Sequence, residues 1–157
     1  MKKILFVCTG NTCRSPMAEA IFQHRSGEKF DWIADSAGTF ASSGEPASPY
    51  AIQAMAEWGV DLSGHRSKPI SASLVDSAQL IVTMSSSHAE ALLAEFPHLA
   101  GRVFLLNAFR TSKMSGGISD PFGAPLEVYQ KTRDEIDQAI SDLLVYLHQN
   151  EPENPSS

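Results

Sequence analysis

Residues 7–16 read VCTGNTCRSP, and we take the chain to be built around this segment. An unbroken apolar run, Ile4 to Val7, comes directly before the loop and predicts a buried strand. Ser15 followed by Pro16 is typical of a helix start, with the serine as the N-cap and the proline in the first turn. The stretch is therefore predicted to be a short loop that joins a buried strand to a helix.

The predicted loop has the features of an anion-binding site. Its backbone N–H groups and those of the first helical turn point into the bend, and the helix dipole adds partial positive charge. Arg14 adds a planar guanidinium that fits phosphate oxygens. Cys8 comes at the edge of the loop, where these charges favour the thiolate, the nucleophilic form of a cysteine. The Ser15 hydroxyl could donate to that thiolate or cap the helix, and both roles fit the sequence.

The composition limits the class of protein. The chain has 157 residues, of which 43% are hydrophobic, and this suits one domain over residues 1–150 with a polar tail over residues 151–157. The net charge of -6 argues against a nucleic-acid-binding surface. No apolar stretch approaches a length of about 20 residues, which a membrane span needs. The two cysteines, Cys8 and Cys13, cannot form the disulfide framework of a secreted domain. We expect a soluble, cytoplasmic monomer that binds neither nucleic acid nor a membrane.

Strand-like and helix-like segments alternate along the chain. The predicted strands are residues 4–7, 31–37, 79–84 and 102–106. The predicted helices are residues 16–27, 48–59, 71–76, 85–96 and 126–148. This order predicts a three-layer α/β/α fold with a four-stranded parallel sheet covered by helices on both faces. Such sheets bind ligands at the carboxyl ends of their strands, where the opening loop emerges. The long loop over residues 107–124 is a second candidate for function, because loops of that length are uncommon in compact domains.

Other chemistries fit the two cysteines less well. A cysteine at a strand end is often inert, but the pattern Cys-x5-Arg-Ser-Pro at a strand-to-helix bend combines a nucleophile, an anion-binding loop and a helix start. A structural zinc site would need a second pair of ligands beyond Cys8 and Cys13. A nucleotide-binding loop would need a Gly-Lys pair or spaced glycines, which this stretch lacks. We therefore expect no metal and no cofactor.

Residues 7–19, VCTGNTCRSPMAE, together with Asp120 and Pro121, resemble the low-molecular-weight protein tyrosine phosphatase family. The segments 35–38 (DSAG) and 65–67 (HRS) and the long last helix also fall where that family has them. The resemblance implies a flavodoxin-like fold and the hydrolysis of phosphorylated residues without a metal.

The resemblance also implies roles for single residues. Cys8 would be the nucleophile, Arg14 the phosphate clamp and Asp120 the general acid. The residues expected to support the loop are Asn11, Ser15, Ser36 and His65. The residues expected to bind the substrate are Thr9, Gly10, Asn11, Thr12, Cys13, Ser15, Phe40 and Phe122.

The finer resemblance is to a bacterial branch of protein arginine phosphatases. Tyrosine-directed members typically carry a bulky aliphatic residue at the position of Thr12, and two aromatic residues after the Asp-Pro pair, where this chain has only Phe122. The short loop 40–44 also resembles the arginine-directed branch. A threonine hydroxyl can accept from a guanidinium N–H, whereas an aliphatic wall suits a phenyl ring. Thr12 could instead merely suit the loop backbone, so phosphotyrosine is kept as the alternative substrate.

The predicted mechanism has two steps. Cys8 attacks phosphorus while Asp120 protonates the leaving group, and Asp120 then activates water to hydrolyse the phosphocysteine. Cys13 could trap an oxidised Cys8 as a reversible disulfide or could simply fill the loop. The implied partners are arginine-phosphorylated or tyrosine-phosphorylated proteins and an opposing protein kinase.

Two further classes of protein share parts of this pattern. An arsenate reductase relays electrons through cysteines beyond the loop, and this chain has none after Cys13. A non-catalytic anion-binding or redox-sensing module would use the same loop without turnover.

Overall fold

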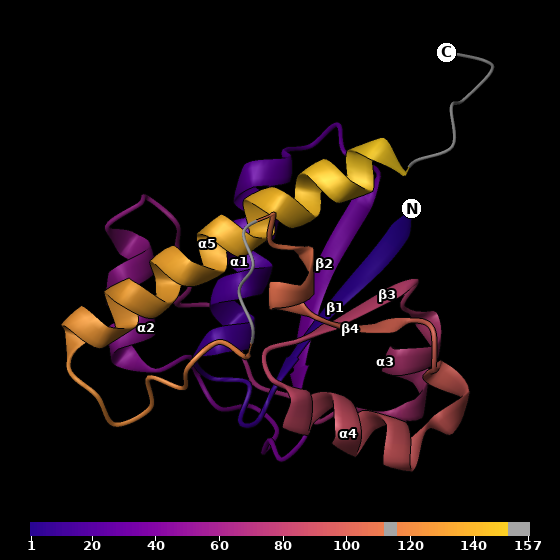
Figure 1. The fold of residues 1–157 in the computed structure, drawn as a ribbon. Helices are drawn as coiled ribbons and strands as arrows, with labels where there is room; N and C mark the ends of the chain where they lie inside the picture. Colours follow the sequence, from indigo (N-terminus) through magenta and orange to yellow (C-terminus); the bar gives the residue numbers. More distant parts are fainter. Residues whose placement is uncertain (112–115, 151–157) are drawn as a thin grey trace.

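The computed structural model describes residues 1–111 and 116–150 and contains one four-stranded sheet (Figure 1). The strands are β1 (Lys2–Cys8), β2 (Trp32–Gly38), β3 (Leu80–Thr83) and β4 (Val103–Leu105). They lie in the order β2-β1-β3-β4, and each neighbouring pair is parallel. The predicted four-stranded parallel sheet is thus confirmed.

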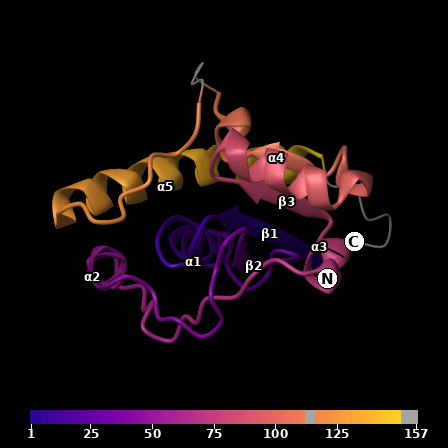
Figure 2. The same ribbon diagram turned by 90° about the horizontal axis from the view of Figure 1, so that it is seen from below.

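Helices cover both faces of the sheet, and in Figure 2 the strands lie between α1 and α4. The α-helices are α1 (Arg14–Ser26), α2 (Pro49–Ala56), α3 (Ala72–Ser77), α4 (Ser86–Glu95) and α5 (Leu126–Gln149). Two short 3-10 helices, η1 (Pro97–Leu99) and η2 (Leu106–Phe109), flank β4. None of the helices in the described ranges is long and apolar enough to cross a membrane.

The sheet is buried on both faces because successive side chains of a strand point to opposite sides. On one face, Ile4 and Phe6 of β1 join a core with α1, α2 and α5. On the other face, Leu5 and Val7 pack against residues of α3, α4 and η1. This two-sided burial explains why the sequence of β1 is a continuous apolar run instead of an alternating one.

The helix boundaries differ from the prediction at one informative place. α1 begins at Arg14, and Cys13, not Ser15, occupies the N-cap position. The prediction of Ser15 as the N-cap was therefore wrong, because its hydroxyl is used elsewhere, as described below. Ser48 does precede α2 as predicted, but its hydroxyl contacts Cys13 instead of capping the helix.

The predicted loop and the predicted tail are described by the structure only in part. η2 lies at the start of the segment predicted as a loop over residues 107–124, so part of that segment is helical. The predicted tail over residues 151–157 lies outside the described residues, and a single domain over residues 1–150 stays a prediction.

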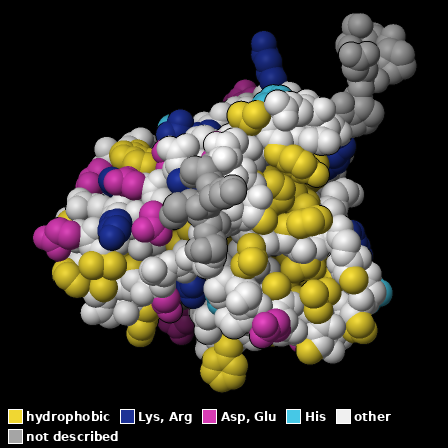
Figure 3. Space-filling view, viewed as in Figure 1, with side chains coloured by type: hydrophobic (Ala, Val, Ile, Leu, Met, Phe, Trp, Pro, Cys, Tyr) yellow, Lys and Arg dark blue, Asp and Glu magenta, His cyan; other side chains and the backbone are white. Residues whose placement is uncertain are grey.

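An aromatic row marks the edge of the sheet at β4. Phe104 packs on Phe109 with ring centroids 6.0 Å apart, and Phe109 packs on Tyr146 at 5.2 Å. Figure 3 shows hydrophobic side chains gathered over this region, from the C-terminal half of α5 across β4. These rings join β4, η2 and α5, and they lie apart from the loop that follows β1.

Candidate active site

The loop after β1 emerges at the middle of the sheet. The chain leaves β1 for β2 on one side, whereas β3 and β4 lie on the other side. A parallel sheet has its crevice at such a switch point, just beyond the carboxyl ends of the strands. Cys8 is the last residue of β1, and α1 begins only six residues later, at Arg14. The fold therefore places the loop and the N-terminus of α1 where a ligand can reach them.

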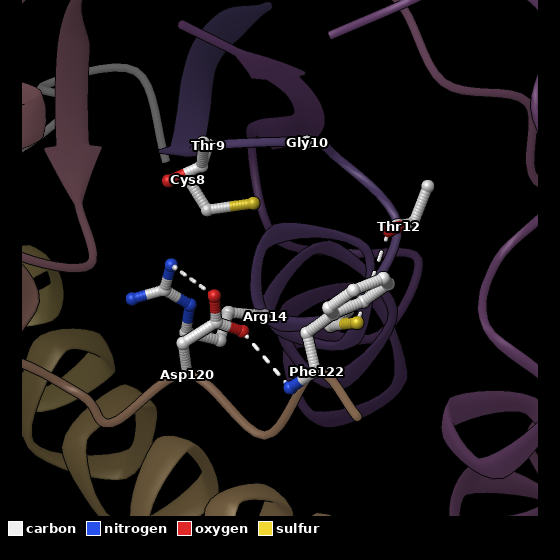
Figure 4. A pocket seen from close by; sticks show the side chains of 8 residues that line it. Cys8, Thr9, Gly10, Thr12, Arg14, Asp120 and Phe122 are labelled. Atoms are coloured by element: carbon white, nitrogen blue, oxygen red, sulfur yellow. Dashed lines mark hydrogen bonds and ion pairs between the residues drawn. The ribbon is translucent and has the colours of Figure 1, made fainter. Parts of the chain in front are cut away.

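A pocket of about 220 Å³ opens over this loop (Figure 4). Its lining consists of Cys8, Thr9, Gly10, Thr12, Cys13, Arg14, Asp120 and Phe122. The first six residues come from the β1–α1 segment, and the last two come from the loop before α5. The structure thus brings together the three residues predicted to be catalytic and five of the eight predicted to bind the substrate.

Arg14 links the two segments of the pocket. Its side chain is only 6% exposed, and its Nη2 lies 3.6 Å from Oδ2 of Asp120, whose side chain is 50% exposed. Nη1 of Arg14 donates to the backbone oxygen of Ile118 at 3.0 Å. The buried Nε finds no hydrogen-bond partner among the described residues. A buried guanidinium with an unpaired N–H group favours the binding of an anion in the pocket.

A buried hydrogen-bond network lies directly behind Cys8. Its Sγ is 2.9 Å from Oγ of Ser15, and Nδ2 of Asn11 donates to that same Oγ at 2.8 Å. Because Asn11 supplies a hydrogen to Ser15, the Ser15 hydroxyl is free to donate its own to the sulfur. Asn11 also donates to Ser36 at 3.0 Å, and Ser36 donates to Glu19 at 2.7 Å. The choice left open by the sequence is thereby resolved, since the Ser15 hydroxyl faces the thiol.

Asn11 is the residue on which this network depends. It has a φ of 57°, the one positive value among the described residues other than glycine. Its Oδ1 accepts from the backbone N–H of Lys68 at 3.0 Å, and its backbone oxygen lies 2.7 Å from Nε2 of His65. Asparagine tolerates this left-handed conformation better than most residues do. The four residues predicted to support the loop are therefore in contact as one network.

Gly38 at the end of β2 makes room for the loop. A Cβ at this position would lie 2.3 Å from the backbone oxygen of Thr9 and 3.1 Å from the backbone nitrogen of Asn11. No side chain fits at these distances. The backbone of β2 can therefore approach the loop closely, and Ser36, two residues earlier, is brought within reach of Asn11.

Three predicted substrate-binding residues lie outside the pocket lining. Asn11 and Ser15 are fully buried behind the loop. Phe40 donates its backbone N–H to the oxygen of Thr9 at 2.9 Å, but its side chain is 88% exposed and does not line the pocket. Phe122 does line it, with a ring that Figure 4 shows beside Thr12.

Several contacts of the site had no clear signal in the sequence. His88 of α4 lies with its Nε2 2.9 Å from Oγ1 of Thr9. Cys13 has its Sγ 2.9 Å from Oγ of Ser48 and 3.4 Å from the hydroxyl of Tyr129. Burial raises the pKa of Tyr129 to about 12, so its hydroxyl keeps its proton at neutral pH. These partners come from three separate helices or their caps, so only the tertiary fold assembles them.

Burial also shifts two titratable groups of the network. It raises the pKa of Glu19, whose carboxyl accepts from Ser36, and it lowers the pKa of His65, which is thereby favoured in its neutral form. A neutral His65 can still donate one N–H, and the backbone oxygen of Asn11 can only accept it. The imidazole proton is therefore assigned to Nε2 of His65.

The arrangement supplies the parts of a two-step group transfer. A thiol is positioned to attack, a guanidinium and a helix N-terminus can hold an anion, and a half-exposed carboxyl can exchange protons with solvent and ligand. Within residues 1–111 and 116–150, the His, Cys, Asp and Glu side chains form no group of three that could hold a metal ion.

Comparisons with known proteins agree with this geometry. A family model described as low molecular weight phosphotyrosine protein phosphatase matches residues 3–153. A protein-arginine-phosphatase of Bacillus subtilis (strain 168) is 39% identical over 145 residues, which cover 92% of this chain and 95% of that protein. One from Geobacillus stearothermophilus is 40% identical over 141 residues, with 90% and 93% covered.

A solved structure of the YwlE arginine phosphatase, a cysteine-to-serine mutant with a phosphorylated active-site serine, superimposes with a TM-score of 0.90. It is 37% identical, and the match covers 95% of this chain and 97% of that one.

Two further relatives have names that point to other substrates. A probable low molecular weight protein-tyrosine-phosphatase EpsP of Ralstonia nicotianae is 36% identical, with 89% of this chain and 92% of that protein covered. An arsenate reductase of Bacillus cereus is 37% identical, with 88% and 91% covered.

Proposed function

Because the chain belongs to the low molecular weight phosphotyrosine protein phosphatase family, we propose that it is a protein phosphatase that hydrolyses phosphoarginine residues. That the chain is a protein phosphatase follows from its family. The choice of phosphoarginine as the substrate is argued from the residues that line the pocket. Phosphotyrosine is the alternative, and the aromatic ring of Phe122 at the pocket is the observation that favours it.

The proposed first step transfers the phosphoryl group to Cys8. The Cys8 thiolate attacks phosphorus in line, the bond from phosphorus to the guanidine nitrogen breaks, and Asp120 gives its proton to that nitrogen. Arg14, the N-terminus of α1 and the loop amides hold the three equatorial oxygens. The Ser15 hydroxyl, 2.9 Å from the sulfur, stabilises the thiolate before the attack.

The proposed second step releases phosphate. Asp120, now a carboxylate, takes a proton from a water molecule whose oxygen attacks phosphorus, and the sulfur–phosphorus bond breaks. Cys8 leaves as a thiolate and Asp120 is again protonated. Half of the Asp120 side chain is exposed, which gives the water a route to phosphorus.

The observation that carries the choice of phosphoarginine is Thr12 at the wall of the pocket. Among the described residues, the hydrogen-bond partner of its hydroxyl is Sγ of Cys13 at 3.8 Å, a long and weak contact. The hydroxyl therefore remains available to accept from a substrate N–H. A site that hydrogen-bonds its substrate discriminates better than one that offers only an apolar wall. The two arginine phosphatases among the relatives support the same choice.

A side-by-side assay tests the proposal. The same peptide is prepared with phosphoarginine or with phosphotyrosine at one position, and kcat/KM is measured for both. We expect the phosphoarginine peptide to be hydrolysed more efficiently. A higher kcat/KM on the phosphotyrosine peptide would replace the proposal with its alternative.

The remaining expectations stay predictions. They are the protein substrates and opposing kinase, the monomeric state, the cytoplasmic location, and a disulfide between oxidised Cys8 and Cys13. Both cysteines are free thiols in this structure. An arsenate reductase function is disfavoured, because the chain has only two cysteines and both belong to the loop.

A further inference from the structure

The turn between β3 and α4, together with the first turn of α4, contacts both segments that form the pocket. His88, the third residue of α4, is 4% exposed although its imidazole is polar. Nδ1 of His88 lies 3.2 Å from the backbone nitrogen of Ser85, and Nε2 lies 2.9 Å from Oγ1 of Thr9. One imidazole therefore bridges the start of α4 and the first residue of the loop after Cys8.

The hydrogen bonds of His88 assign the proton on its ring. The backbone N–H of Ser85 can only donate, so Nδ1 must accept. In a neutral imidazole the proton then lies on Nε2, which donates to Oγ1 of Thr9. Because Oγ1 receives this hydrogen, the hydroxyl of Thr9 is free to donate its own hydrogen in another direction. Thr9 lines the pocket, so an anion bound there is a ready acceptor.

The surroundings keep His88 neutral. Burial is the main cause, and the positive charge of Arg14 adds to it, while Asp120 acts in the opposite direction. Together they lower the pKa of His88 from 6.5 to about 4. At neutral pH the residue therefore provides a directed N–H donor without placing a second full positive charge beside Arg14.

The same turn also holds the segment that carries Asp120. The backbone N–H of Ile118 donates to the oxygen of Met84 at 2.8 Å. Gly117 lies so close that a Cβ would be 2.8 Å from that oxygen and from Cβ of Ser85. Thr83 donates to the oxygen of Ser85 at 3.0 Å and stiffens the turn. Both parts of the pocket are thus anchored on residues 83–88.

We propose that His88 is a positioning residue that directs the Thr9 hydroxyl toward the phosphoryl group bound in the pocket. The proposal rests on the proposed function for its substrate, but its contacts involve only the phosphate-binding loop. It therefore applies equally to phosphoarginine, phosphotyrosine and inorganic phosphate.

The variant His88→Asn tests the proposal. The shorter side chain can still accept from the backbone N–H of Ser85 but cannot reach Thr9. We expect kcat/KM for a phosphopeptide to fall by about 10-fold, the effect of one lost hydrogen bond. We expect Thr9→Val, which removes the hydroxyl and keeps the shape, to cause a similar loss. The double variant should be no less active than Thr9→Val alone, because each change removes the same interaction.

Phosphate binding provides a second readout that does not depend on the substrate. Iodoacetamide alkylates a free Cys8, and inorganic phosphate in the pocket should protect it. We expect both single variants to need more phosphate for half-maximal protection than the wild type. His98→Asn, the same substitution at an exposed histidine on η1 that pairs with Asp76, serves as the matched control and should match the wild type in both assays.

The outcomes separate the two proposals. If the wild type hydrolyses phosphotyrosine but not phosphoarginine, the proposed substrate is wrong, while the effects of His88→Asn and Thr9→Val on phosphate protection still test His88. Additive losses in the double variant, or wild-type behaviour of Thr9→Val, would overturn the role of His88. If His88→Asn does not fold, wild-type phosphate protection in Thr9→Val still overturns the role of His88.

Discussion

The two segments that form the pocket are held in opposite ways. The loop after β1 rests on a buried network in which Asn11, Ser15 and Ser36 are each at most 1% exposed. The segment with Asp120 and Phe122 lies at the surface, where the Asp120 side chain is 50% exposed and Phe122 is 74% exposed. The first segment is held by buried side chains, and the second is held mainly through the backbone of the residues just before Asp120.

The backbone contacts that hold the second segment lie before its functional residues, at Gly116 and Ile118. Ile118 hydrogen-bonds to Met84 and to Arg14, whereas Asp120 forms an ion pair with Arg14 at 3.6 Å and accepts from the N–H of Phe122 at 3.1 Å. A phosphate-binding loop has to be preorganised, because its donors must already face the charge that develops in the transition state. A general acid must exchange protons with substrate and water, and exposure permits this. Mutation of the buried residues that support the loop should therefore lower stability, whereas mutation of the exposed carboxyl should lower the rate.

The largest effect is expected from Cys8→Ser, which breaks the chemistry of the buried segment and leaves its packing intact. We expect turnover of a phosphopeptide to fall by roughly ten-thousand-fold or more, because a serine hydroxyl is a much poorer nucleophile than a thiolate. Steady-state kinetics measures the loss, and circular dichroism checks the fold. Unchanged activity would mean that the loop only binds anions.

The next largest effect is expected from Asp120→Asn in the exposed segment. We expect kcat to fall by about 10² to 10⁴-fold, the usual contribution of a general acid. The melting temperature should stay close to that of the wild type, because the side chain is half exposed. Asp61→Asn, the same change at an exposed carboxylate of another loop, is the matched control for both measurements. A large drop in melting temperature for Asp120→Asn would contradict the contrast between the segments.

Asn11→Ala, a substitution in the buried segment, should lower the stability of the folded protein. The substitution removes the side-chain contacts to Ser15, Ser36 and Lys68 and puts an alanine at a φ of 57°. We expect a loss of about 2–4 kcal/mol in the free energy of unfolding, measured with denaturant. Asn11→Gly removes the backbone strain at this φ but still lacks the three hydrogen bonds. Its free energy of unfolding should therefore lie between those of the wild type and Asn11→Ala. Wild-type stability of Asn11→Ala would show that the network does not hold the loop.

The smallest effect is expected from Thr12→Ile at the wall of the pocket. It exchanges a hydroxyl acceptor for an apolar surface, so we expect the ratio of kcat/KM for phosphoarginine over phosphotyrosine peptides to drop by about 10-fold. The ratio within one variant cancels errors in the amount of active enzyme. If the ratio matched that of the wild type, Thr12 would not select the substrate, and selection would have to come from the exposed segment.

Much of the fold could be predicted from local patterns. Apolar runs and helix-start signals located every strand and α-helix, because periodic burial and capping act over a few residues. The start of α1 could not be predicted from them. Ser15 and Pro16 fit the pattern of a helix cap. The Ser15 hydroxyl instead forms hydrogen bonds with Cys8 and Asn11, and α1 begins at Arg14. The capping pattern is overridden by side-chain hydrogen bonds within the loop.

The phosphate-binding loop follows from local sequence, because Cys8, Arg14 and the start of α1 are close along the chain and a strand-to-helix bend is enough to gather them. The distant groups that complete the site become apparent only in the folded chain. Asp120 reaches the pocket through Ile118 and Arg14, and His88 reaches Thr9 through the turn after β3. The physical reason is that these contacts depend on which strands are neighbours in the sheet, and strand order follows from packing over the whole chain.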